Sequence, residues 1–333
     1  MRVAVVGATG AVGQVMVEVL EERGFPVDQL DLLASARSAG QTWQGYTVRE
    51  ATPEAFEGVD LALFSAGSEI SRALAPAARE AGALVVDNSS AFRMDPDCPL
   101  VIPEVNGTAI AGHRGIIANP NCSTILLCMA LAPLHRVAGL RRVVVCSYQA
   151  VSGAGVRARQ ELERQQEADA RGDQPIHEVF PKVLAHNVIP WVQALEEDGY
   201  STEETKIRDE TRRILDLPGL PVAATCVRVP VWSAHAEAVH VELERPLSPG
   251  DARDVLAAAE GVEVAPEGDF PTPREVAGTD SVQVGRIRGD RAFEPGLALW
   301  CVMDQLRKGA AVNAVQIAER ALGTAAATQR RET

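Results

Sequence analysis

The sequence lacks the cysteine spacing of a metal site and the long apolar run of a membrane span. Its six cysteines include no CxxC pair and no other ligand-like spacing, so we predict no metal and reduced thiols. No stretch approaches the roughly 18 apolar residues that cross a bilayer. The chain enters a strand pattern directly from Met1, without a cleavable apolar segment. These absences predict a cytoplasmic protein without a membrane partner.

Positive charge is scarce as well. Lysine and arginine together number 32 against 45 acidic residues, and the formal net charge is −13. This balance disfavours nucleic acid as a partner, but it does not restrict a small substrate because local charge can oppose the global sign. A length of 333 residues and a hydrophobic content of 46% indicate a globular chain with two domains.

The first third of the chain alternates between strand-like and helix-like stretches. Short buried strands are expected in RVAVVGATG, DLLASARS, DLALFSAG and ALVVDNSS, with helical repeats between them. Strands separated by helices predict a parallel sheet, and hence an α/β, Rossmann-like dinucleotide-binding domain. We place this domain at residues 1–120 and expect a C-terminal helix at 308–333 to complete it.

The remaining residues, 121–307, are predicted to form an α+β domain. Strand-rich stretches such as LRRVVVCSYQAV and AHAEAVHVELE dominate this part of the sequence. Helices are expected among them at 154–168, 203–216 and 250–260. The pattern predicts a mostly antiparallel sheet.

The stretch VAVVGATGAVG places three glycines between the first strand and the first helix. Glycine permits a tight bend, a close approach of the backbone to a pyrophosphate and close helix packing. The strand–turn–helix context favours dinucleotide binding over a merely structural turn. The cofactor contacts predicted here are Gly7, Thr9, Gly10, Ala11, Val12 and Gly13.

The end of the second strand discriminates between the two nicotinamide cofactors. Enzymes that use NAD usually carry an acidic residue there, which binds the ribose 2′-OH. The stretch LLASARSAG has Ser35, Arg37 and Ser38 instead, and these side chains suit a 2′-phosphate. We therefore predict NADP rather than NAD, with an ordinary surface arginine as the alternative for Arg37.

One cysteine, Cys122, stands between Asn121 and Ser123 in ANPNCSTILL, where a helix-like repeat begins. In the first turn of a helix, the unpaired N–H groups and the positive end of the dipole favour a thiolate. Cys122 is therefore a candidate nucleophile. A buried structural cysteine is the alternative.

A set of motifs extends over nearly the whole chain, from residue 7 to about 319: GATGAVG, NSSAFRMD, VIPEVN, NPNCSTI, QAVSGAG, RVPV with AHAEAV, and NAVQIAE. In content and order this set resembles the bacterial type of aspartate-semialdehyde dehydrogenase, and NPNCST is its most specific part. The resemblance implies reductive dephosphorylation of L-aspartyl 4-phosphate by NADPH, in lysine (diaminopimelate), threonine and methionine biosynthesis. It also implies a homodimer or a dimer of dimers built through the second domain.

The resemblance further implies roles for individual residues. Cys122 is the implied nucleophile, through a thioester, and His235 is the implied acid and base. Arg228 is implied to bind the substrate carboxylate, with a salt bridge in the sheet as the alternative. The other implied residues are Gln149 and Glu203 for the substrate, Arg93 and Lys206 for phosphate, Asn121 for the carbonyl oxygen or phosphate, and Ser152, Gly153, Asn313 and Gln316 for the cofactor.

Three alternatives stay open. Lys206 can instead form an ordinary i,i+3 helix pair with Glu203. The enzyme can act by the same mechanism on N-acetyl-γ-glutamyl phosphate. A non-catalytic sensor that binds NADP could use the same scaffold, but it would not need a nucleophile and a base together.

Overall fold

The computed structural model describes residues 1–324, and these form two compact units. The first unit comprises residues 1–121 and the described residues from 310 on, and the second comprises Cys122–Gly309. The last helix, α9 (Val312–Leu322), belongs to the first unit and ends at Gly323. The helix expected at 308–333 is therefore shorter than predicted, and residues 325–333 of that range lie outside the described residues.

The first unit is built on a six-stranded sheet in which every described pairing is parallel. The strand order is β5-β2-β1-β6-β7-β8. The strands are β1 (Arg2–Val6), β2 (Gln29–Ala34), β5 (Arg49–Glu50), β6 (Leu61–Phe64), β7 (Leu84–Asp87) and β8 (Ile116–Ala118), and a two-stranded ribbon of β3 (Thr42–Trp43) and β4 (Tyr46–Thr47) follows β2. The predicted Rossmann-like sheet is confirmed.

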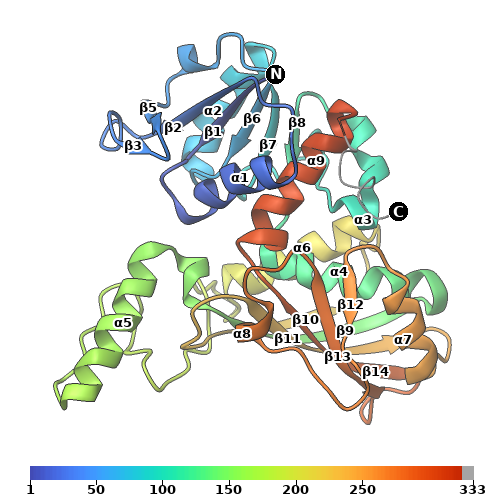
Figure 1. Cartoon of the computed structure of the whole chain (residues 1–333). Coiled ribbons are helices and arrows are strands. Elements are labelled where there is room, and N and C mark those ends of the chain that lie inside the picture. The colour runs from blue at the N-terminus through green and yellow to red at the C-terminus, as the bar shows by residue number, and fades with distance from the viewer. Residues whose placement is uncertain (325–333) are drawn as a thin grey trace. The chain divides into compact units, whose positions relative to one another are not determined.

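Helices cover both faces of this sheet, which is why its central strands are continuously buried rather than alternating. Apolar residues of α1 (Ala11–Glu22) and α9 form one core with the sheet, and those of α2 (Ser68–Glu80) form another. Figure 1 shows α1 and α2 beside the parallel strands of this unit. Short helices, α3 (Pro103–Asn106) and two 3₁₀ turns (Pro53–Phe56, Gly107–Gly112), complete the unit.

The second unit is built on a mixed six-stranded sheet. Its strand order is β10-β9-β11-β14-β13-β12. The strands are β9 (Leu140–Gln149), β10 (Val222–Arg228), β11 (His235–Leu243), β12 (Val262–Val264), β13 (Val282–Gly289) and β14 (Gly296–Met303). The inner pairs are antiparallel, but β10 runs parallel to β9 and β12 runs parallel to β13. The predicted mostly antiparallel sheet is confirmed, since its three inner pairs are antiparallel and only its two edge pairs are parallel.

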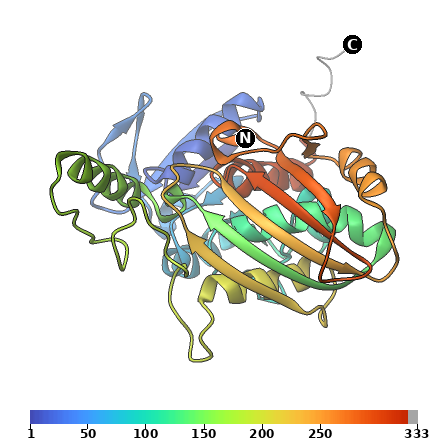
Figure 2. The same ribbon diagram turned by 90° about the horizontal axis from the view of Figure 1, so that it is seen from below.

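Helix α4 (Cys122–Ala138) covers the middle of one face of this second sheet. It packs against β9, β11, β13 and β14, and most of its residues are buried. Its sequence is apolar around the whole circumference, as expected for a helix enclosed on all sides. Figure 2 shows α4 behind the strands of the sheet.

The three helices expected in the second unit are present with shifted ends. They are α5 (Val156–Arg171), α6 (Thr202–Ile214) and α7 (Pro249–Ala257). A capping box of Ser201 and Glu204 fixes the start of α6. Shorter turns are α8 (Pro273–Val276), a 3₁₀ turn (Val151–Ala154) and a π-helical turn (Arg307–Ala311). Among the described residues, no helix has the length and apolarity needed to cross a membrane.

Candidate active site

The register of the second sheet sorts the side chains that face α4 into rows. Residues at directly opposed positions lie on the same face, and every second residue of a strand returns to that face. The first row contains Arg228 beside Gln149 and His235 beside Met303. The next row runs through Cys226, Ser147, Glu237 and Cys301. The row after that is apolar, with Ala224, Val145, Val239 and Leu299.

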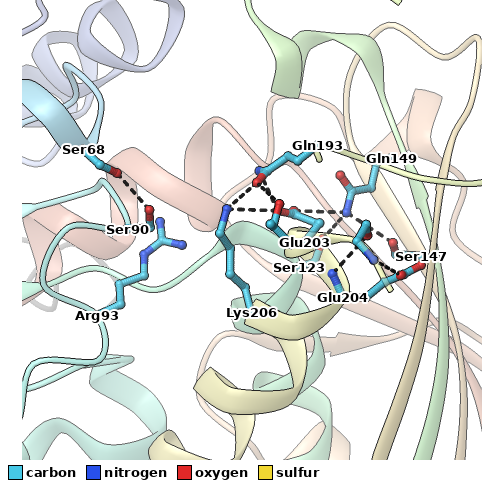
Figure 3. A network of polar contacts seen from close by, with 12 residues as sticks. Ser68, Ser90, Arg93, Ser123, Ser147, Gln149, Gln193, Glu203, Glu204 and Lys206 are labelled. Carbon is cyan, nitrogen blue, oxygen red and sulfur yellow. Dashed lines mark hydrogen bonds and ion pairs between the residues drawn. The ribbon is translucent and has the colours of Figure 1, made fainter. Parts of the chain in front are cut away.

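Gln149 connects the first row to the helices around it. Its Nε2 donates to Ser123 Oγ of α4 at 2.9 Å, to Ser147 Oγ at 3.2 Å and to Glu203 Oε1 of α6 at 3.3 Å. All four side chains are buried. Figure 3 shows these bonds converging on the Gln149 amide nitrogen. The predicted substrate residues Gln149 and Glu203 are therefore in direct contact.

Glu203 is a carboxylate in the first turn of α6, at the positive end of the helix dipole. Its Oε2 accepts from Gln193 Nε2 at 2.7 Å and lies 3.8 Å from Lys206 Nζ, while Lys206 also donates to Gln193 Oε1. The i,i+3 pair considered for Lys206 is thus present. Lys206 is about three-quarters buried, so its ammonium is held beside Glu203 rather than free in solvent.

His235 is held in one tautomer. Its Nδ1 accepts from the Ala150 N–H at 3.1 Å, so the proton of the neutral ring lies on Nε2. That Nε2 is buried and has no hydrogen-bond partner among the described residues. Burial, followed by the nearby Arg228 charge, lowers the pKa of His235 to about 3. His235 is therefore a neutral ring with an N–H available to a ligand.

Arg228 lies beside this ring and is anchored at one end. Its Nη1 donates to the Ala150 carbonyl at 2.6 Å, and burial lowers the pKa of the guanidinium against the opposing influence of Glu203 and Cys122. Gly153 leaves room next to both side chains, since a Cβ there would lie 3.1 Å from His235 Nε2 and 3.6 Å from Arg228 Nη1. No carboxylate forms a salt bridge with Arg228 within the described residues.

Cys122 is the first residue of α4 and is half-buried. Gly309 packs against it, because a Cβ at Gly309 would lie 3.1 Å from Cys122 Cβ and 2.8 Å from Met303 Cε. The other cysteines differ in environment. Burial raises the pKa of Cys128, Cys226 and Cys301, which lie deeper in the same unit. Only a thiol that can ionise is a nucleophile, and these three are structural.

Two predicted phosphate residues belong to the first unit. Arg93 is buried, and its Nε and Nη2 donate to the carbonyls of Asn119 and Asn88, each at 2.9 Å. Asn121 is also buried and is the last residue before Cys122. Figure 3 includes Arg93 near the Ser68–Ser90 hydroxyl pair of the same unit.

The first unit also contains a pocket of about 290 Å³ at the carboxyl ends of β1, β2 and β6. Gly7, Thr9, Gly10 and Ser35 contribute to its lining. Helix α1 starts at Ala11, so its free N–H groups open beside the glycine turn. Such a pocket, between backbone donors and apolar strand ends, suits the phosphates and one heterocycle of a dinucleotide.

The glycines of this turn are required by close packing. Gly7 has φ +83°, and a Cβ there would lie 2.6 Å from the Ser65 carbonyl oxygen. A Cβ at Gly13 would lie 2.3 Å from the Gly7 carbonyl oxygen. Arg37 is exposed and Ser38 is half-buried, both in the turn after β2.

The remaining predicted cofactor residues already have partners. Asn313 Nδ2 donates to Val101 O at 3.0 Å and to Asn119 Oδ1 at 2.6 Å. Gln316 Nε2 donates to Glu104 Oε1 at 3.0 Å. Ser152 Oγ accepts from Gln305 Nε2.

Comparison with known proteins identifies the family of this chain. Residues 2–113 match the family described as semialdehyde dehydrogenase, NAD binding domain, and residues 131–308 match its dimerisation domain. Aspartate-semialdehyde dehydrogenase of Aquifex aeolicus (strain VF5) is 51% identical over 329 residues, covering 96% of this chain and 97% of that protein. The chain belongs to the aspartate-semialdehyde dehydrogenase family.

Solved aspartate-semialdehyde dehydrogenases share the fold. The crystal structure of aspartate semialdehyde dehydrogenase II complexed with ASA from Vibrio cholerae has a TM-score of 0.94 and 48% identity, covering 98% of this chain and 99% of that one. Aspartate semialdehyde dehydrogenase with NADP from Candida albicans has a TM-score of 0.75 and 26% identity, covering 96% and 97%. The predicted family and the prediction of an oxidoreductase are confirmed, and the non-catalytic sensor is set aside.

In this aspartate-semialdehyde dehydrogenase family member, sequence reasoning missed several members of the polar network. Ser123, Ser147 and Gln193 all hydrogen-bond within it. Ser147 had a signal, since it lies two residues before Gln149 in a strand and must share its face. Ser123 had a weaker signal as the neighbour of Cys122. Gln193 lies in an irregular segment, and nothing in its local sequence marks it.

Proposed function

We propose that the chain catalyses NADPH-dependent reductive dephosphorylation of L-aspartyl 4-phosphate to L-aspartate 4-semialdehyde and phosphate. The observation that carries this proposal is that Gln149, Arg228 and His235 share one face of the sheet, with Glu203 of α6 bonded to Gln149, and that α4 packs on this face and begins at Cys122. We place the reaction in lysine, threonine and methionine biosynthesis on the strength of the family. The cytoplasmic location predicted from the sequence stays a prediction.

The first half-reaction forms a thioester on Cys122. The thiolate attacks the acyl carbon of aspartyl phosphate, a C–S bond forms, and the C–O bond to phosphate breaks as phosphate leaves. The start of α4 supports the thiolate through its N–H groups, and the influence of Cys122 on the Arg228 pKa puts that cation within electrostatic reach. The Cys122 N–H or the Asn121 amide is a candidate donor to the carbonyl oxygen.

The second half-reaction reduces the thioester. NADPH, when bound, supplies the hydride that this step requires. His235 offers Nε2–H to the carbonyl oxygen as that oxygen gains negative charge, and the hemithioacetal then collapses to the aldehyde and the Cys122 thiolate. A neutral imidazole suits this role, because burial keeps the ring uncharged and the Ala150 N–H bond to Nδ1 leaves the ring proton on Nε2.

The two ends of the substrate call for different partners. The Arg228 guanidinium fits the α-carboxylate, and the Glu203 carboxylate fits the α-ammonium group. We propose Arg93, Lys206 and Asn121 as phosphate ligands. A buried carboxylate favours a free amino group over an N-acetyl group, which has no positive charge, and this supports aspartyl phosphate over N-acetyl-γ-glutamyl phosphate.

The cofactor proposal is NADP, bound by the first unit. The glycine turn, the start of α1 and the pocket at the strand ends fit the dinucleotide. Ser35, Arg37 and Ser38 replace the acidic residue of NAD enzymes, and the relative from Candida albicans was solved with NADP. Ser152, Gly153, Asn313 and Gln316 stay proposed contacts.

We propose a homodimer, or a dimer of dimers, formed through the second unit. The match to a dimerisation domain supports this proposal. On the sheet face opposite Gln149, Tyr148 and Trp300 pack with ring centroids 5.5 Å apart, and Tyr148 is exposed. An exposed aromatic on a broad sheet face is typical of a protein interface.

One assay tests the proposed reaction in reverse. Purified protein should reduce NADP with L-aspartate 4-semialdehyde, and the rate should depend on added phosphate. N-acetyl-L-glutamate 5-semialdehyde serves as the competing substrate. Faster turnover of the N-acetylated compound, or NADP reduction that is independent of phosphate, would overturn the proposal.

A further inference from the structure

We propose that Ser123 and Ser147 are positioning residues for Gln149, and that they hold its amide so that Oε1 accepts a hydrogen bond from the ammonium group of the substrate. This inference rests on the proposed function, since it names what Gln149 recognises in that reaction. It assigns Gln149 the role of an acceptor, and it adds two serines to the residues that decide which substrate is used.

The orientation of the Gln149 amide follows from the group opposite it. Glu203 is buried, accepts from Gln193, and lies beside the Lys206 ammonium, which are the surroundings of an ionised carboxylate. An ionised carboxylate can only accept, so the amide atom that faces it at 3.3 Å must be the NH₂ group. Turning the amide over would bring its carbonyl oxygen against a buried negative charge, at a cost of several hydrogen-bond energies.

The serines fix the position of the amide rather than its direction. A hydroxyl can donate or accept, so neither serine alone would distinguish the two amide orientations. Both are fully buried, on separate elements, and their oxygens lie 2.9 Å and 3.2 Å from Gln149 Nε2. Ser123 belongs to α4 and follows Cys122 directly, so it ties the amide to the helix that carries the thiol. Ser147 belongs to the same strand as Gln149, two residues earlier.

The two N–H groups of Nε2 are shared among these three acceptors, so Oε1 is the amide atom left for the substrate. In Figure 3 the dashed lines from Gln149 start at its nitrogen, and none starts at this oxygen. Arg228 lies directly beside Gln149 on the neighbouring strand. An α-amino acid bound to Arg228 through its carboxylate carries its ammonium group on the next carbon atom. A carbonyl oxygen and the Glu203 carboxylate together suit a group with three N–H donors.

The test compares L-aspartate 4-semialdehyde with 4-oxobutanoate, which has the same carbon chain without the amino group. The measured quantity is the ratio of kcat/KM for the two compounds, in wild type, Gln149→Ala, Ser123→Ala and Ser147→Ala. We expect the wild-type preference for the amino compound to fall strongly in Gln149→Ala. Each serine variant should lower it about three- to tenfold, as for one lost hydrogen bond. Ser71→Ala is the control, because it loses a buried hydroxyl bond to Asp87 in the first unit and should leave the ratio unchanged.

A double-mutant cycle separates positioning from general support of the fold. In the Gln149→Ala background, adding Ser147→Ala or Ser123→Ala should change the ratio no further. Equal loss of activity on both compounds, or fully additive effects of serine and glutamine variants, would overturn the inference. Failure of wild type to turn over the semialdehyde would instead contradict the proposed function. The two failures are therefore distinguishable.

Discussion

The two units present their binding surfaces by different means. In the first unit, the surface at the strand ends is made of backbone and small residues, and its shape depends on glycines such as Gly7 and Gly13 that have no room for a Cβ. In the second unit, the long side chains of Gln149 and Glu203 contact each other at one face of a sheet, and Arg228 lies beside Gln149 on the neighbouring strand. The first surface suits a common cofactor, and the second suits one substrate. A substitution that adds a Cβ should weaken binding at the first surface, whereas one that removes a polar group should weaken binding or catalysis at the second.

The strongest test of the second unit removes one sulfur. Cys122→Ser should lower kcat by about 10³-fold or more, because a serine hydroxyl at this position has no comparable ionised form. NADP affinity, measured by fluorescence titration, should stay nearly unchanged. Stoichiometric alkylation of the wild-type thiol is the matched chemical control. Substantial turnover by the serine variant would exclude the nucleophile role.

Substitutions of His235 and Arg228, two residues of the first row, should change different kinetic parameters. His235→Asn should lower kcat by about 10²- to 10⁴-fold with little change in KM, because proton donation acts in the transition state. Arg228→Lys keeps the charge but loses the two-pronged fit, so it should mainly raise KM for the semialdehyde. Steady-state kinetics under identical conditions decide between them. A His235 variant altered only in KM would contradict the assignment.

The glycine turn should respond to an added methyl group. Gly13→Ala would place a Cβ 2.3 Å from the Gly7 carbonyl oxygen, so the turn must shift. We expect a loss of about 1–3 kcal/mol in stability, as for overpacking, together with weaker NADP binding. Gly112→Ala is the control, since no atom lies within 4 Å of its added Cβ. Equal thermal midpoints for the two variants would show that the turn tolerates the methyl group.

The preference for NADP over NAD tests the role proposed for Arg37. Arg37→Ala should weaken NADP binding by about 1–3 kcal/mol, as for a lost charge-assisted hydrogen bond. NAD binding should hardly change, because NAD has no 2′-phosphate. Calorimetric titration with both dinucleotides is the measurement. Equal losses for the two would mean that Arg37 supports the fold instead.

The smallest expected effect concerns a buried acid in the row below the site. Burial, followed by the charge of Glu203, raises the pKa of Glu237, whose oxygens have no hydrogen-bond partner among the described residues. The folded state therefore keeps this proton while the unfolded state releases it, and stability falls as pH rises above the unfolded value. Glu237→Gln has no proton to keep, so its stability lacks this dependence on pH. The difference between its thermal midpoint and that of wild type should therefore shift in favour of the variant as pH rises from about 5 to about 8. A difference that is independent of pH would contradict the neutral form.

The sequence predicted the features that depend on neighbouring residues, but it did not predict the contacts between segments that are far apart in the chain. The glycine turn and the start of α4 depend on neighbouring residues, so Gly7, Gly13 and Cys122 could be located from their immediate context. The mixed sheet could not, because nothing inside β10 records that it pairs in parallel with β9. Glu237 and Ser147 are partners across two strands that are far apart in the sequence. Only the register brings them together, and register is a property of the whole sheet.

The residues of the first row all lie at the ends of their strands. Gln149 is the last residue of β9, Arg228 is the last of β10, Met303 is the last of β14, and His235 is the first of β11. Extra residues inserted beyond these points, in the connecting loops, would leave every pairing intact. One residue inserted inside any of these strands would turn the terminal side chain to the opposite face. Natural variation in length should therefore be concentrated in the loops just outside this row and stop abruptly at its members.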